Sequence, residues 1–368
     1  MKISYIYLLV TILFVIFSYV FVDPNIPYLN YIYTGIYGSD RLFVTAIYCV
    51  FILTFFGFYV HLIRKKPDLG MIKQYILFSL PLVFSYPAIL SFDILNYILT
   101  AKLSFVYFEN PYTVMPIEIP NEPMLDFTHA ANKLALYGPL WILLTSLPLT
   151  LSFGFFPLTI ILFKFFTAIF YFLILAIIYK LTGSTKSLLF FALNPLVLIE
   201  TFVSGHNDVI MMFFALLAFL FLMQKRRIIS SIAIVASVLI KYATIFLLPL
   251  YFWSFIRNLR GKKIKIEQIG IWGFYSMLII YLLSPLRAEL YPWYTVWLIT
   301  FAALAIRNRF IFYLSIVISF GVLFRYVPFM LLGTHLGPTP LIKILVTLVP
   351  VLIFLFVIFI KHLINFRR

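Results

Sequence analysis

Apolar runs long enough to cross a lipid bilayer recur from one end of the sequence to the other. A transmembrane helix needs about 20 predominantly apolar residues, and runs such as 3–22 and 157–181 reach that length. The bilayer core offers no water to backbone N–H and C=O groups, so such a run adopts a helix, which pairs these groups internally. The sequence therefore predicts an all-α, polytopic membrane protein.

The composition agrees with a membrane protein and excludes a chain of soluble domains. Of the 368 residues, 64% are hydrophobic and 11% are charged, whereas soluble domains average about 45–50% apolar and about 25% charged residues. The net charge of +16 would suggest nucleic-acid binding in a soluble protein. In a membrane protein the same excess is expected from Lys and Arg in cytoplasmic loops. We therefore predict the lipid bilayer as a partner and no nucleic acid.

Charged and turn-forming clusters divide the apolar sequence into candidate spans. The candidates are 3–22, 43–63, 74–90, 157–181, 187–204, 208–223, 228–257, 269–285, 293–306, 310–331 and 341–361. The run 228–257 is long enough for two spans and is interrupted at Lys241, so we expect about twelve transmembrane helices, within a range of 11–13. Basic clusters such as 64–66 and 257–265 place their connections in the cytoplasm.

One connection is much longer than the others and is expected on the outer side. Residues 91–156 include the apolar segment 139–153. If this segment crossed the membrane, the orientation of every later span would be reversed and the basic residues after 157–181 would lie outside. We therefore interpret it as an interfacial helix. A loop of this length is uncommon unless it is functional. We predict a single integral membrane domain, 1–368, in which the outer loop at about 91–156 carries juxtamembrane helices and is the candidate catalytic loop. Core spans follow at about 157–306 and C-terminal spans at 310–361.

Polar side chains gather at the expected outer ends of the spans. Asp93 follows the third span in SFDILNYILTAKL, and a carboxylate at a membrane boundary is a functional candidate. Ser91 or Asp93 is also suited to cap a helix over 94–108. Further candidates in this loop are Asn110, Tyr112, Tyr137 and Trp141. Their Asn-Pro and Gly-Pro neighbours also fit an ordinary surface loop with aromatic anchors.

A second polar cluster lies between the fifth and sixth spans, in NPLVLIETFVSGHND. Glu200 lies inside an apolar run, where carboxylates usually face a cavity, and His206 and Asp208 lie in the short turn that follows. The turn also fits a solvated hairpin in which Asp208 caps the next helix. His206 and Asp208 alone are too few ligands for a metal site.

Two cationic positions complete the candidate set. Lys241 is either a lysine that snorkels at a helix end or a cation placed to meet a phosphate at the mouth of a cavity. Arg287 precedes Tyr291 and Trp293, where an Arg–Glu surface pair beside an aromatic belt is the alternative to phosphate or sugar contact. We favour phosphate and sugar contact because all these groups fall on one face of the membrane.

In their order along the chain, these motifs resemble the GT-C superfamily of membrane glycosyltransferases, in particular polyprenyl(dolichyl)-phosphate-mannose-dependent mannosyltransferases. The resemblance covers about residues 74–300 and rests on FDILNY (92–97), NPY (110–112), YGPLW (137–141), the segment 194–208, the break at Lys241 and YPWY (291–294). Two features depart from the family pattern. Asp93 follows the third span rather than the first, and no DD or DxD pair accompanies it.

The resemblance implies transfer of a hexose, with mannose the default, from a polyprenyl-phosphate-linked donor to a glycan or glycolipid acceptor at the outer membrane face. The transfer would invert the anomeric centre, with Asp93 as general base. Contacts to the donor phosphate or sugar would come from His206, Asp208, Lys241 and Arg287. The acceptor or sugar platform would comprise Asn110, Tyr112, Tyr137, Trp141, Glu200, Tyr291 and Trp293. No cofactor is implied, and a divalent metal stays an open alternative.

Two other functions fit the same topology. A transporter or flippase of lipid-linked sugars needs ionisable groups deep in the bilayer, and Lys164 and Glu200 are the candidates. A non-catalytic subunit of a glycosylation complex is the second alternative. No P-loop, GxGxxG, CxxC or HExxH motif occurs, so nucleotide and zinc-protease chemistry have no support. We expect the chain in the plasma membrane, with its active site facing outward.

Overall fold

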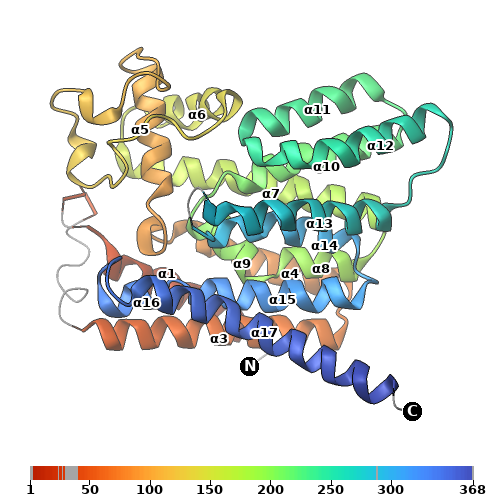
Figure 1. The fold of residues 1–368 in the computed structure, drawn as a ribbon. Coiled ribbons are helices and arrows are strands. Elements are labelled where there is room, and N and C mark those ends of the chain that lie inside the picture. The colour runs from red at the N-terminus through yellow and green to blue at the C-terminus, as the bar shows by residue number, and fades with distance from the viewer. Residues whose placement is uncertain (1–2, 24, 27, 30–39, 287–288, 367–368) are drawn as a thin grey trace.

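Helices are the predominant secondary structure in the parts of the chain that the computed structural model describes, which are residues 3–23, 25–26, 28–29, 40–286 and 289–366. No strand occurs in these ranges. The long helices run side by side in one bundle, and α5 (Asp93–Phe105) crosses them at one end together with the loop that follows it (Figure 1). This arrangement agrees with the predicted all-α, polytopic architecture.

Six helices in the described ranges are long and apolar enough to cross a membrane. They are α1 with η1 (Ile3–Phe21), α3 (Arg41–Lys65), α7 (Phe156–Thr182), α13 with η8 (Ile266–Leu286), α15 with α16 (Arg309–Leu332) and α17 (Thr339–Phe366). Each coincides with a predicted span. A seventh candidate is the pair formed by α8 (Thr185–Ala192) and the segment Pro195–Val203, which are bent by 55°. The predicted total of twelve is therefore not confirmed by helix length.

The remaining predicted spans correspond to shorter helices. They are α4 (Leu69–Ser79) with η2 (Leu80–Phe84), α10 (Asp208–Met223), α11 (Arg227–Ile240), α12 (Leu248–Leu259) after η7 (Tyr242–Leu247), and α14 (Thr295–Leu304) after η9 (Pro292–Tyr294). The predicted interruption of 228–257 is present, because Lys241 is extended (φ −155°, ψ 125°) between α11 and η7.

The long loop contains little regular structure besides α5. It holds the single turns η4 (Pro116–Glu118) and η5 (Pro123–Asp126), and then α6 (Pro139–Leu151) at the position of the predicted interfacial helix; η3 (Pro87–Ile89) precedes α5. The buried Glu122 fixes the loop to α5, because it accepts hydrogen bonds from Lys102 Nζ at 2.5 Å and from the Tyr107 hydroxyl. Ser91 Oγ accepts the backbone N–H of Asp93 at 3.3 Å. The N-cap of α5 is Phe92 and no side chain caps the helix, so neither Ser91 nor Asp93 has the capping role that the sequence allowed.

The most enclosed part of the bundle is the segment 187–212, in which every residue is buried. It comprises α8, α9 (Pro195–Leu198), the π-helical turn η6 (Ile199–Val203) and the start of α10, which packs against α7 and α11. Asn194 caps α9 after the bend. The hydroxyls of Tyr59 and Tyr171 donate to the carbonyls of Phe190 and Ala192, which pairs backbone groups near the break. Polar residues on this segment are therefore held rigidly inside the protein.

Candidate active site

A cavity of about 720 Å³ lies where α5 and the loop residues 130–137 meet η7, α13 and η9. Its volume lies within the range of about 300–1,000 Å³ that is typical of small-molecule sites. Five predicted site residues line it: Asp93, Tyr137, Lys241, Tyr291 and Trp293. One wall, formed by η7 and α13, is mainly apolar and includes Ile245, Phe246 and Ile280, whereas α5 and the loop add Asn96 and Lys133.

A close backbone approach brings the loop and Lys241 to the same cavity. Gly138 N donates to Ile240 O at 3.0 Å, immediately before Lys241. A Cβ atom at Gly138 would lie 2.1 Å from Leu239 O, so a larger residue would push the loop away from the end of α11. The glycine of the YGPLW motif therefore has a structural role, which is to place Tyr137 beside Lys241.

A second glycine places the hairpin between η6 and α10 against α5. Gly205 has φ +69°, a left-handed conformation that glycine adopts without strain. A Cβ atom there would lie 3.0 Å from Ile94 Cδ1, directly after Asp93 in the chain. The next residue, His206, is thereby placed next to Asp93 on the side away from the cavity.

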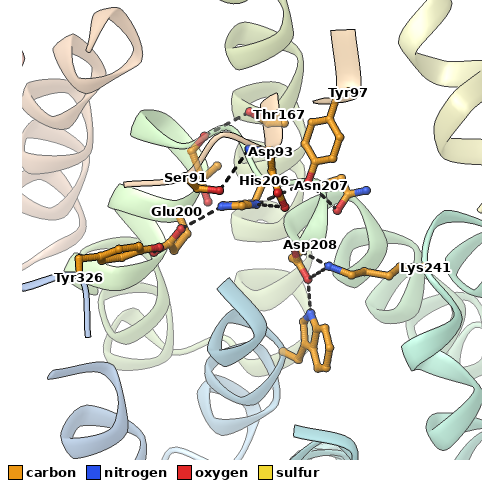
Figure 2. Close-up of polar contacts among 12 residues, drawn as sticks. Ser91, Asp93, Tyr97, Thr167, Glu200, His206, Asn207, Asp208, Lys241 and Tyr326 are labelled. Atoms are coloured by element: carbon orange, nitrogen blue, oxygen red, sulfur yellow. Dashed lines mark hydrogen bonds and ion pairs between the residues drawn. The ribbon is translucent and has the colours of Figure 1, made fainter. Parts of the chain in front are cut away.

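His206 lies between two carboxylates (Figure 2). Its Nδ1 is 3.6 Å from Asp93 Oδ2, and its Nε2 is 3.3 Å from Glu200 Oε2. The other oxygen of Glu200 accepts a hydrogen bond of 3.0 Å from the Tyr326 hydroxyl. The side chains of His206 and Glu200 are 1% and 0% exposed, whereas that of Asp93 is 25% exposed. Only Asp93, of these three ionisable groups, reaches the cavity.

The surroundings of Asp93 and His206 set their charge states. Enclosure raises the pKa of the Asp93 carboxyl to about 6, although the Lys241 ammonium opposes the rise. Burial, together with the positive charge of Lys241, lowers the pKa of His206 well below its usual value, so its imidazole is neutral. Asp93 is therefore mostly ionised near neutral pH but readily protonated, which suits a group that accepts a proton during a reaction.

Asp208 acts on the cavity through Lys241. Its carboxylate lies 2.9 and 3.1 Å from Lys241 Nζ and accepts a hydrogen bond of 2.5 Å from Trp297 Nε1. The same ammonium lies 4.6 Å from the ring centroid of Tyr294. Asp208 is the first residue of α10 and Asn207 occupies the capping position, so the alternative of Asp208 as a simple helix cap does not hold. Asp208 is fully buried and fixes the position of the cation.

The aromatic residues at the cavity form a stack. The Trp293 ring lies between His206, with centroids 4.1 Å apart, and Tyr291, with centroids 4.4 Å apart, and both pairs are nearly parallel. Because both faces of Trp293 are covered, a sugar cannot lie flat on it. Tyr291 lies at the end of the stack, and both Tyr291 and Trp293 line the cavity.

Other predicted residues support the cavity from outside. Tyr112 donates its hydroxyl to Tyr137 O at 2.8 Å, and Asn110 Oδ1 accepts the backbone N–H of Tyr112 at 3.0 Å. Trp141 is buried and packs edge-on against Tyr97, with centroids 5.0 Å apart. None of Asn110, Tyr112 and Trp141 lines the cavity.

The predicted cation at 287 lies outside the described residues. Glu289, two residues later, pairs with Arg325 at 2.8 Å and with Lys343 at 3.4 Å.

The two predicted candidates for ionisable groups deep in the bilayer, Lys164 and Glu200, are both fully buried. Lys164 Nζ donates to Ser85 O at 2.5 Å.

Three side chains at the site were not predicted from the sequence. Tyr97 contacts His206 and Asn207, Trp297 binds Asp208, and Tyr326 binds Glu200. Tyr97 carries a recognisable signal, since residues i and i+4 share a helix face and it follows Asp93 by four positions. Trp297 and Tyr326 are 89 and 126 residues from their partners, and no local pattern marks them.

Among the potential metal-ligating side chains of the residues that the structure covers, Asp93, His206 and Glu200 are neighbours. Even so, no three His, Cys, Asp or Glu side chains in the covered ranges lie close enough to hold a metal ion.

Comparison with known proteins identifies one family. A family model described as alpha-(1→6)-mannopyranosyltransferase, N-terminal domain, matches residues 24–257, which is 234 of the 368 residues. The matched range includes Asp93, Glu200, His206, Asp208 and Lys241 and ends before the stack at Tyr291 and Trp293. No curated protein and no solved structure matches the sequence.

Proposed function

This chain belongs to the alpha-(1→6)-mannopyranosyltransferase family, and we propose that it transfers a mannosyl unit from a polyprenyl-phosphate-linked donor to a hydroxyl of a glycan or glycolipid acceptor. The observation that carries this proposal is that a carboxylate, Asp93, and an ammonium, Lys241, line the same cavity. Such a pair serves the two charges of the reaction, since the acceptor loses a proton while the leaving phosphate gains negative charge.

The donor fits the apolar side of the cavity. Tyr242, Ile245 and Phe246 of η7 line the cavity and are 49%, 46% and 38% exposed, so this wall continues onto the apolar outer surface of the bundle. A polyprenyl chain placed along it would bring the donor phosphate to Lys241, which supplies a charge-assisted contact. Tyr291 offers a ring face to the sugar.

The transfer step uses Asp93 as general base. The acceptor oxygen attacks the anomeric carbon while its proton passes to the Asp93 carboxylate. The bond between the anomeric carbon and the phosphate oxygen breaks, and the polyprenyl phosphate leaves with the electron pair beside Lys241. A single displacement inverts the anomeric centre, so the α linkage in the family description would require a β-linked donor.

We propose that the cavity faces outward, in a plasma membrane that the chain crosses about twelve times. The loop that follows α5 and the 260–265 connection lie at opposite ends of the bundle (Figure 1). The latter carries Arg260, Lys262, Lys263 and Lys265. Because basic connections favour the cytoplasmic side, the cavity end is expected outside.

The proposal is tested by mannosyl transfer from a polyprenyl-phosphate-mannose donor to membrane acceptors, with wild type compared with Asp93→Asn. Loss of a general base typically costs about 10²–10⁴-fold in rate, and we expect a loss in this range. Asp126→Asn is the matched control, because Asp126 lies in the same loop, is exposed and does not line the cavity. Equal transfer by Asp93→Asn and wild type would contradict the role of Asp93.

A further inference from the structure

We propose that His206 and Glu200 are a buried hydrogen-bonding pair that positions the Asp93 carboxylate and keeps it ionised through the Nδ1–H group of His206. The inference rests on the proposed function, because it concerns the base of that reaction. Neither His206 nor Glu200 lines the cavity, so both act through Asp93 and are positioning residues.

The neighbours of His206 Nδ1 determine that this nitrogen carries the proton. The Tyr97 hydroxyl donates its only hydrogen to Asn207 Oδ1 at 3.3 Å, so its oxygen faces Nδ1, at 3.5 Å, as an acceptor. Asp93 Oδ2, at 3.6 Å from Nδ1, is also an acceptor when the carboxyl is ionised. With acceptors on both sides, a protonated Nδ1 is favourable and an unprotonated one is repelled. The imidazole N–H therefore lies between two acceptors, the Tyr97 hydroxyl at 3.5 Å and the Asp93 carboxylate at 3.6 Å.

The opposite nitrogen requires a partner that supplies a proton. His206 Nε2 and Glu200 Oε2 are both buried without a hydrogen-bond partner and lie 3.3 Å apart, and the Ser204 side chain also acts on the Glu200 carboxyl. A neutral ring protonated at Nδ1 has a lone pair at Nε2, so these two atoms satisfy each other when Glu200 holds a proton and donates it. The Tyr326 hydroxyl donates to the remaining oxygen, Glu200 Oε1. Glu200 thus fixes the tautomer of His206, because the proton on one ring nitrogen is set by the hydrogen bond that the other ring nitrogen makes.

The local backbone holds this pair in place. Glu200 lies on the π-helical turn η6, and such turns occur frequently at functional sites. Trp293 stacks on the imidazole and fixes its plane. Several charged and titratable groups surround the pair. They are Asp93 and Tyr97 from α5, Tyr48 from α3 and Tyr326 beside Glu200, and Asp208 and Lys241 across the hairpin. Lys133, Tyr137 and Tyr291 also act on Asp93.

The first test compares His206→Leu with His206→Asn in the pH dependence of kcat, measured with a mannose donor in membranes. Leu removes the N–H that stabilises ionised Asp93, so the acid limb of the profile should move up by about one pH unit. The amide of Asn places a donor near the position of Nδ1 and should restore most of this shift. A purely structural role of His206 would reduce the amount of folded enzyme but leave the limb where it is.

The second test compares Glu200→Gln with Glu200→Leu. The Gln amide can donate to His206 Nε2 while its carbonyl accepts from Tyr326, so it reproduces the protonated acid and should keep the acid limb at the wild-type pH. Leu provides no donor, and we expect the same upward shift as in His206→Leu, at an unchanged KM for the donor. Thermal unfolding of each variant checks that it is folded.

The outcomes separate this inference from the proposed function. Wild-type transfer that Asp93→Asn abolishes, combined with an unmoved acid limb in His206→Leu or Glu200→Leu, would overturn the inference and leave the function intact. A shift in Glu200→Gln as large as in Glu200→Leu would overturn the protonated state assigned to Glu200. Absence of mannosyl transfer in folded wild-type protein would overturn the proposed function itself.

Discussion

Replacement of Lys241 separates its two roles, as the partner of Asp208 and as the cation of the cavity. In Lys241→Met, Asp208 loses both contacts to the ammonium, at 2.9 and 3.1 Å, and its side chain has no exposed surface. Trp297 Nε1 is the side-chain donor that remains. Removal of one partner of a buried ion pair costs about 3–5 kcal/mol. We expect about 3 kcal/mol here because the Lys241 side chain is 16% exposed and therefore partly solvated.

The assay is thermal unfolding of purified protein in lipid nanodiscs, together with mannosyl transfer. A loss of about 3 kcal/mol corresponds to a fall in Tm of roughly 4 °C in a chain of 368 residues. The double variant Lys241→Met with Asp208→Asn no longer buries an unpaired carboxylate and should regain most of the lost stability. Its transfer rate should stay about 10²-fold or more below wild type, because no cation is left for the phosphate. Asp208→Asn alone retains that cation.

Two results would refute this reasoning. If the double variant regains both stability and transfer, Lys241 serves only as an ion-pair partner and the phosphate contact is wrong. If Lys241→Met unfolds at the wild-type temperature, Asp208 does not depend on Lys241, and the geometry of the pair does not describe the protein.

Three further predictions concern the loop and the base. Gly138→Ala should lower transfer at least tenfold by pushing the loop from α11, whereas Gly57→Ala, where an added Cβ meets no atom within 4 Å, should not. Glu122→Gln should destabilise the protein by about 1.5–3 kcal/mol at pH 7, since the carboxylate accepts charged and neutral hydrogen bonds. Burial raises the pKa of Glu122, but the hydrogen bonds from Lys102 and Tyr107 outweigh burial and leave this pKa below its usual value. The difference in unfolding free energy between wild type and Glu122→Gln should therefore shrink as the pH falls below about 4.3. The kcat/KM of the wild type should fall below about pH 6, where Asp93 becomes protonated and stops accepting a proton, and a pH-independent profile between 5 and 7 would exclude Asp93 as base.

Apolar runs predicted the long helices closely, because a lipid-facing helix must be apolar along its whole length. The expected span 157–181 and α7 (Phe156–Thr182) differ by one residue at each end. The interruption at Lys241 was also predicted, because a charge there breaks an otherwise continuous apolar run; the structure adds that this residue is extended. Runs of intermediate length, such as 208–223 and 293–306, were less informative. They form short helices enclosed by neighbours, and burial inside the protein produces the same apolar sequence as a membrane does.

The sequence predicted most residues of the site, but it did not predict which of them line the cavity and which lie behind the lining. Asp93 and Lys241 do line one cavity, as the shared membrane face suggested. His206 and Glu200 were expected to contact substrate, and the structure places them behind Asp93. Glu200 lies on a π-helical turn, which changes the angular position of its side chain from that in an α-helix, and Gly205 sets where the hairpin meets α5. Neither effect is visible in hydropathy or in motif spacing.

We propose that this protein transfers mannose from a lipid phosphate with Asp93 as base, and the predictions about transfer rates depend on this proposal. The most direct measurement is transfer of labelled mannose from polyprenyl-phosphate β-mannose to a mannose-terminated acceptor by the purified protein in lipid vesicles, with the anomeric configuration of the product read by NMR. We expect an α-linked product with wild type and with Asp126→Asn, and a rate at least 10²-fold lower with Asp93→Asn. A β-linked product, or equal rates for Asp93→Asn and wild type, would contradict it.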